Sequence, residues 1–66
     1  MSTNQIKGFF ITRGLTLLDV AAATQEHYSE IWRVVNYERV NERLRKKLER
    51  KYRGLKFDRT IERKAA

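Results

Sequence analysis

The side chains best suited to chemistry in this sequence are cationic, and they gather in its second half. The chain carries fifteen Lys and Arg against eight Asp and Glu, a formal net charge of +7. Residues 1–32 hold two basic and three acidic side chains, whereas residues 33–66 hold thirteen basic and five acidic ones. Seven of these bases lie between Arg43 and Arg53, beside a single acid. This split favours a polyanionic partner, nucleic acid first and an anionic membrane second, with a solvated helix face as the alternative.

Catalytic and metal-binding patterns are weak by comparison. The densest group of titratable residues is Asp19, Glu26, His27 and Glu30. They flank an expected turn, where carboxylates suit helix capping better than acid–base catalysis. The sequence has no cysteine, one histidine and three scattered glycines, so it offers no thiolate site and no phosphate loop. We therefore expect no enzyme, no metal, no cofactor and no small-molecule ligand.

Length and composition predict one small domain. A chain of 66 residues can bury a single core, near the lower limit of what folds alone. No apolar run approaches the roughly 20 residues that a membrane-spanning helix needs. The lack of cysteine and the polar, uncharged residues 1–5 favour the cytoplasm over secretion.

Apolar spacing predicts a first helix over residues 4–13. Ile6 and Phe10 lie one turn apart, and Asn4 is a plausible N-cap. Gly14 stands where the chain needs a left-handed residue to leave the helix. The first helix should therefore end just before Gly14.

Two further helices are expected on either side of a short turn. Thr16 and Asp19 have the spacing of a capping box, which starts a helix that runs to about Thr24. Residues 25–27 interrupt the apolar pattern, and a second amphipathic helix begins near Tyr28.

The basic stretch should form a separate helix. Val40, Leu44, Leu48 and Tyr52 recur at four-residue steps, and Asn41 can cap a helix that runs to about Arg53. One long helix over 28–53 is the alternative, which we disfavour because asparagines suit helix ends.

The chain divides into a domain over residues 1–54 and a basic tail over residues 55–66. Residues 55–57 alternate between apolar and charged side chains, as in a short edge strand. The sequence does not distinguish helix from disorder in the rest of the tail. The tail could serve as a dimerisation segment, because a small core leaves apolar side chains uncovered.

Helical geometry selects the outward face of the helix that begins at Tyr28. At 100° per residue, Ile31, Val34 and Val35 turn toward the core. Arg33 turns away, where its guanidinium can pair with guanine O6 and N7. The outward face also carries Tyr28, Ser29, Trp32 and Asn36.

Three of these outward residues have alternative roles. Arg33 could instead pair with Glu26 or Glu30. Tyr28 could contact a thymine methyl or a phosphate, or lie partly buried against the preceding helix. Trp32 could reach bases or sugar, pack on a partner subunit, or tuck under the tail.

Three motifs follow one another in a distinctive order: Gly14–Leu15–Thr16–Leu17–Leu18–Asp19–Val20–Ala21, then Ser29–Glu30–Ile31–Trp32–Arg33–Val34, then Asn36 and Arg39. Together they resemble the lambda-type repressor/Cro helix-turn-helix family over about residues 5–52. The resemblance implies an all-α, four- to five-helix, lambda-repressor-like domain with a basic C-terminal helix and tail. It further implies a sequence-specific DNA-binding transcriptional regulator, usually dimeric and often from a phage or mobile element.

Several residues depart from the pattern of that family. Gln25 stands where the turn usually has glycine, so it must adopt a left-handed conformation or be bypassed. Tyr37 replaces the glycine that usually follows the recognition helix. Phe10 and Val35 replace a frequent Arg–Glu ion pair, and an apolar pair can do so without loss of stability. Leu17 replaces a glutamine that usually contacts a phosphate.

The hypothesis is a Cro-type repressor that binds an inverted repeat as a homodimer, in a prokaryotic nucleoid or a phage-infected cell. Base contacts are expected from Tyr28, Ser29, Trp32 and Arg33. Phosphate contacts are expected from Thr16, His27, Asn36, Arg39, Arg43, Lys46 and Lys47, and His27 could alternatively cap its helix. Dimer contacts are expected from Leu55, Phe57 and Ile61. The alternatives are a protein-interaction module, antitoxin-like or host-factor binding, and a non-specific nucleic-acid binder.

Overall fold

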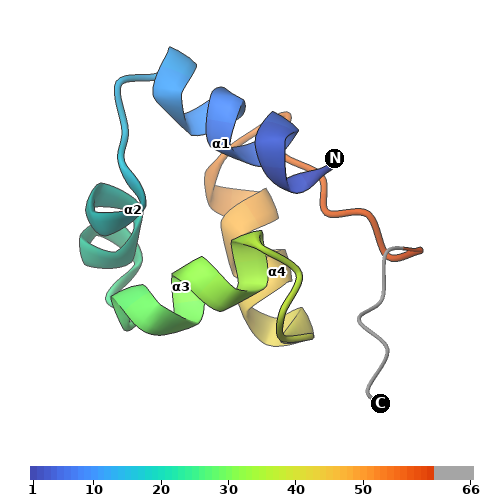
Figure 1. Ribbon diagram of the computed structural model, residues 1–66. Coiled ribbons are helices and arrows are strands. Elements are labelled where there is room, and N and C mark those ends of the chain that lie inside the picture. Colours follow the sequence, from blue (N-terminus) through green and yellow to red (C-terminus); the bar gives the residue numbers. More distant parts are fainter. Residues whose placement is uncertain (61–66) are drawn as a thin grey trace.

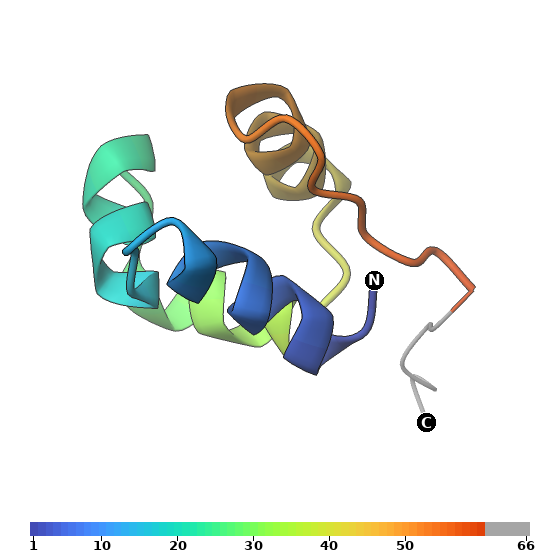
Figure 2. The same ribbon diagram turned by 90° about the horizontal axis from the view of Figure 1, so that it is seen from above.

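The structure, a computed structural model, describes residues 1–60 and contains four α-helices within them. They are α1 (Thr3–Thr12), α2 (Leu17–Thr24), α3 (Tyr28–Val35) and α4 (Glu42–Lys51). In Figure 1, α2 and α3 meet at the lower left, and α1 lies above α3. The view from above in Figure 2 shows that α4 lies behind α1 and α3. Over residues 1–60 the expected all-α class is confirmed, since that part of the chain holds no strand. None of these helices has the length and apolar character needed to cross a membrane.

The start of α1 differs from the prediction. Ser2, not Asn4, is the N-cap: its Oγ accepts a hydrogen bond from the Gln5 N–H at 3.2 Å. The Gln5 side chain accepts in return from the Ser2 N–H at 2.8 Å. This capping box satisfies two free donors, which a cap by Asn4 alone would not do. The end of α1 is as predicted, because Gly14 adopts a left-handed φ of 72°.

The predicted pair of short helices is confirmed. Thr16 Oγ1 accepts from the Asp19 N–H at 3.1 Å, and Asp19 Oδ2 accepts from the Thr16 N–H at 2.9 Å. The chain then forms α2 up to Thr24 and resumes as α3 at Tyr28. Ala21 is buried on α2, whose main helical neighbour is α3.

Residues 36–41 separate α3 from α4, so the single long helix is excluded. Asn36 ends α3, and Asn41 caps α4 by accepting from the Leu44 N–H at 3.1 Å. Tyr37 adopts a positive φ of 60° between them, in place of the glycine usual in the resembled family. The expectation that α4 reaches Arg53 is wrong, because α4 ends at Lys51 and the chain turns before the left-handed Gly54.

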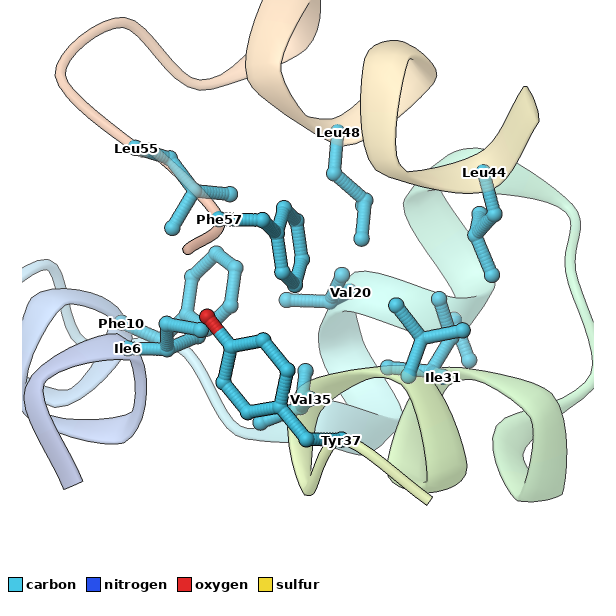
Figure 3. Packing of buried hydrophobic residues seen from close by; sticks show 12 residues of the cluster. Ile6, Phe10, Val20, Ile31, Val35, Tyr37, Leu44, Leu48, Leu55 and Phe57 are labelled. Atoms are coloured by element: carbon cyan, nitrogen blue, oxygen red, sulfur yellow. The ribbon is translucent and has the colours of Figure 1, made fainter. Parts of the chain in front are cut away.

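All four helices contribute to one apolar core, shown in Figure 3. Phe10 and Val35 lie in it at 1% and 0% exposure, as expected for an apolar pair in place of an ion pair. Val40 is the exception in the predicted stripe of α4: it lies before the helix and is 52% exposed. The remaining core residues are Ile6, Val20, Ala21, Ile31, Val34, Tyr37, Leu44, Leu48, Leu55 and Phe57.

The expected roles of the tail need correction. Leu55 and Phe57, two of the predicted dimer contacts, are only 2% and 5% exposed and belong to the core of their own chain. Residues 55–57 form no strand. The physical reason is the small size of the domain, since four short helices alone leave the core open on one side. Ile61, the third predicted dimer contact, lies outside the described residues.

Polar contacts also hold the segment after α4 in place. The Tyr37 hydroxyl donates to the Met1 carbonyl and accepts from the Asp58 N–H at 2.7 Å, so one side chain joins both ends of the described chain. The Arg59 guanidinium donates to Glu42 at 2.7 Å and to Glu49 at 2.5 Å. It thereby clips the segment to two turns of α4, and its hydrogen bonds lower the pKa of Glu42.

Candidate nucleic-acid interface

The outward face of α3 is the surface on which the predicted base contacts converge. Ile31, Val34 and Val35 are 0% exposed, so the inward face is fixed against the core. On the opposite face Ser29 and Arg33 are exposed, and the residues Tyr28 and Trp32 are 46% and 38% exposed. The helix therefore presents a hydroxyl, a guanidinium and two aromatic rings together to solvent.

The Arg33 side chain is available for a ligand because its alternative partners are engaged elsewhere. Glu30 lies 3.5 Å from the Arg39 guanidinium and accepts a hydrogen bond from the Asn41 amide at 3.1 Å. Glu26 is bound by two residues of α4. Within residues 1–60 no ion pair or hydrogen bond of the Arg33 side chain is found.

The turn between α2 and α3 is closed without glycine. Gln25 adopts φ 59° and ψ 37°, the left-handed conformation expected at this position. The Glu26 N–H donates to the Ala21 carbonyl at 3.0 Å, which satisfies the end of α2. A left-handed non-glycine residue costs roughly 1 kcal/mol, a strain that the packing of α2 on α3 must offset.

Glu26 joins this turn to α4. Its carboxylate accepts both terminal nitrogens of Arg43, at 2.9 and 3.1 Å, and the Lys47 ammonium at 2.9 Å. Lys47 also donates to the Thr24 carbonyl at 2.8 Å. These hydrogen bonds lower the pKa of Glu26 from 4.5 to about 2. We call Glu26, Arg43 and Lys47 the turn clip.

The turn clip changes what can be expected of two predicted phosphate contacts. Arg43 and Lys47 remain 64% and 42% exposed, so their contact with phosphate stays a prediction. Their charge is already partly neutralised, however, and the hydrogen-bonding fork of Arg43 faces a carboxylate. Lys46, between them on the helix, is exposed and makes no such contact within residues 1–60.

The other predicted phosphate contacts differ in how free they are. Thr16 is exposed, but its hydroxyl caps α2. The Asn36 amide donates to the Trp32 carbonyl at 2.8 Å and closes the end of α3. His27 is exposed at the N-cap position of α3, but the suggestion that it caps the helix is wrong, because its side chain makes no capping hydrogen bond. Arg39 is half exposed beside Glu30.

A basic hollow of about 380 Å³ lies between the end of α2 and α4. The sequence did not single it out, because its two walls are more than twenty residues apart in the chain. Its cationic wall could accept a phosphate beside the turn. The lining residues are Ala23, Thr24, Gln25, Lys47, Arg50 and Lys51.

The burial of Arg45 is not predicted from the sequence. Within the basic run it reads as one more surface cation, but it is 1% exposed. Its guanidinium lies 5.6 Å from the ring centre of Tyr37 and 5.7 Å from that of Phe57, and 3.7 Å from the Glu42 carboxylate. Its position one turn before Leu48, on the edge of the apolar stripe, was the available signal.

No family model matches the chain, and neither a curated protein nor a solved structure shows significant similarity to it. Within residues 1–60 no cluster of three or more His, Asp and Glu side chains has the arrangement of a metal site.

Proposed function

We propose that this protein is a sequence-specific DNA-binding transcriptional regulator of Cro-repressor type, in which α2, the turn and α3 form a helix-turn-helix. The observation that carries the proposal is the division of α3 into a fully buried apolar face and an exposed face with Ser29, Arg33 and two aromatic rings. A helix with its side chains is about 10–12 Å wide, and the major groove of DNA is about 12 Å wide. An α3 braced from behind by α2 can therefore enter the groove.

Each exposed side chain of α3 has a matching group on DNA. Arg33, with no internal partner within residues 1–60, offers the bidentate donor pair that reads guanine. Ser29 can donate to or accept from a base edge, and the Tyr28 ring can cover a thymine methyl. Lys46 and Arg39 are exposed cations outside α3 that add contacts to phosphates, which set position rather than sequence. The protein acts by occupying its site, as a homodimer on an inverted repeat.

Selection of bound DNA from a random pool, at about 150 mM salt and with competitor DNA, tests the proposal. We expect enrichment of an inverted repeat whose half-sites are about one helical turn, 34 Å, apart. Recovery of unrelated sequences with one common salt dependence would contradict sequence reading and favour a non-specific binder that uses the basic hollow.

A protein-interaction module is the second candidate, and the exposed rings of Tyr28 and Trp32 favour it. Aromatic residues dominate protein–protein hot spots. In that case Trp32→Ala would abolish capture of a protein partner, and the pool selection would yield no motif.

A further inference from the structure

An apolar surface lies at the junction of α1 and α2. The connection between these two helices is at the upper left of Figure 1. We call Ile11, Leu15, Leu17 and Leu18 the front apolar face. Ile11 and Leu18 are 72% and 63% exposed, more than any other large apolar residue within residues 1–60. Beside them a hollow of about 240 Å³ is lined by Lys7, Phe10, Ile11, Leu15, Thr16 and Leu17. Large apolar side chains exposed beside an apolar hollow are typical of a surface that binds a partner.

The segment after α4 offers no interface to the proposed homodimer, because its apolar side chains are buried. Leu55 and Phe57, which the sequence offered as dimer contacts, are buried within their own chain. Tyr28 and Trp32 lie on the outward face of α3, which the proposed function assigns to DNA. Val40 stands alone in the loop before α4. The front apolar face is thus the apolar surface left over for protein contact in residues 1–60.

The charge distribution selects the kind of partner that fits this face. The half of the chain that carries the face, residues 1–32, has two basic and three acidic side chains, whereas residues 33–66 have thirteen basic and five acidic ones. A polyanion, an anionic membrane or a strongly acidic protein would be drawn to the second half. A partner at the front face should instead be nearly neutral where it touches. The front half of a second copy meets that requirement, and front-to-front contact keeps the two basic halves apart.

Two opposite charges accompany the face, Lys7 and Asp19, the second of which directly follows Leu18 in α2. Lys7 lines the hollow, and no ion pair of its ammonium is found within residues 1–60. Asp19 uses Oδ2 to accept the Thr16 N–H, and Oδ1 makes no hydrogen bond with residues 1–60. In an isologous dimer Lys7 of each copy can therefore meet Asp19 of the other.

We infer that the front apolar face is where a second copy of this chain docks, with Ile11 and Leu18 of each copy entering the hollow of the other. The inference rests on the proposed function for the need of a dimer on an inverted repeat. A dimer joined at the α1–α2 junction leaves the outward face of each α3 open to DNA. The arrangement is closed, since each face is used by its own symmetry mate and no further copy can add.

Sedimentation equilibrium of the full chain without DNA tests the inference. We expect a reversible monomer–dimer equilibrium in which Leu18→Ser raises the dissociation constant about tenfold or more, as the loss of a buried leucine at each of two symmetric contacts implies. Val40→Ser is the matched control: it removes another exposed apolar side chain, 52% against 63% for Leu18, away from the face and should change nothing. Circular dichroism checks that both variants remain folded, as their exposure leads us to expect.

A wild-type chain that stays monomeric at all concentrations would overturn the inference, and so would an equal effect of both variants. Binding of DNA half-sites separates this outcome from failure of the proposed function. If Leu18→Ser keeps wild-type affinity for a single half-site but loses cooperative binding to the inverted repeat, both proposals hold. A dimer that binds no DNA motif would leave the interface intact and contradict the regulator.

Discussion

α3 and α4 are both amphipathic helices with cations on their outer faces, and they use those cations in opposite ways. α3 carries one arginine, Arg33, which has no internal partner within residues 1–60. α4 carries six cations, but Arg45 is buried between two rings, and Arg43 and Lys47 are held by Glu26. Three of the six cations in this stretch therefore support the fold: Arg43 and Lys47 fix the turn, and Arg45 fills part of the core. The density of charge in this sequence therefore does not show which cations are free to meet a ligand.

The largest effect should come from removing the buried cation of α4. Arg45→Ala leaves a cavity between Tyr37 and Phe57 and removes an ion pair with Glu42, so we expect a loss of about 3 kcal/mol of unfolding free energy. A domain of this size rarely has more than about 3–5 kcal/mol in total, so the variant should be largely unfolded. Urea denaturation followed by circular dichroism measures this.

Two further variants test the cause. Arg45→Met keeps most of the side-chain volume and should cost about 1 kcal/mol or less, because apolar replacement of a buried ion is often tolerated. Lys46→Ala, at the exposed neighbouring position, should change stability by less than about 0.5 kcal/mol. Equal destabilisation by Arg45→Ala and Lys46→Ala would contradict a buried role for Arg45 and an exposed position for Lys46.

The free cation of α3 should matter for recognition instead of stability. Arg33→Ala should weaken binding to the selected DNA by about 1–3 kcal/mol while leaving non-specific binding largely intact, because it removes a bidentate base contact. Lys46→Ala should weaken binding to all sequences alike, because it removes one contact that neutralises a phosphate. The slope of the logarithm of the binding constant against the logarithm of the salt concentration should fall in magnitude by about 0.9. Fluorescence anisotropy with selected and scrambled duplexes measures both. An Arg33→Ala variant in which both kinds of binding were weakened equally would argue against base reading.

Features set by neighbours along the chain could be predicted from the sequence. The Thr16–Asp19 capping box, the start of α3 and its buried face depend on residues three or four positions apart. The misplaced start of α1 was predictable as well, since Ser2 and Gln5 have the same capping-box spacing as Thr16 and Asp19. The reciprocal pair of hydrogen bonds between Ser2 and Gln5 outweighs the single cap that Asn4 could provide.

Features set by distant pairs could not be predicted. Arg43 meets Glu26, and Arg59 meets Glu42, each across 17 positions of sequence. Such pairings depend on where α4 lies relative to the turn, and helical periodicity carries no information about that. The burial of Leu55 and Phe57 has the same origin, because it required knowing which side of the core the four helices leave open.

The turn clip provides a smaller effect that depends on pH. The pKa of Glu26 is lowered from 4.5 to about 2 by its hydrogen bonds with Arg43 and Lys47. The folded state thus holds the proton less tightly than the unfolded chain, so the contribution of Glu26 to stability is present above pH 4.5 and is lost as the pH falls toward 2. Glu26→Gln should lower the unfolding free energy at neutral pH by roughly 1 kcal/mol. It should also flatten the acid limb, which is the fall in stability between pH 4.5 and 2.

Glu38→Gln is the matched control for the turn clip. It makes the same charge change at an exposed acid that has no side-chain partner within residues 1–60, so its acid limb should match that of the wild type. If the two glutamine variants gave the same pH profile of thermal unfolding, the profile would reflect overall charge and not the turn clip.

The smallest expected effect concerns the strained residue that sets α3 apart from α2. Gln25 has a positive φ, and its side chain is exposed without a hydrogen bond to residues 1–60. Gln25→Gly removes the left-handed penalty but adds backbone freedom to the unfolded chain, so we expect a net stabilisation of only about 0.5 kcal/mol.

Gly14→Ala probes the same penalty in reverse, because an added Cβ there meets no atom within 4 Å and only the backbone at φ 72° is strained. It should destabilise the protein by roughly 1 kcal/mol. Thermal unfolding of both variants measures these effects, and destabilisation by Gln25→Gly would mean that the glutamine side chain itself supports the turn.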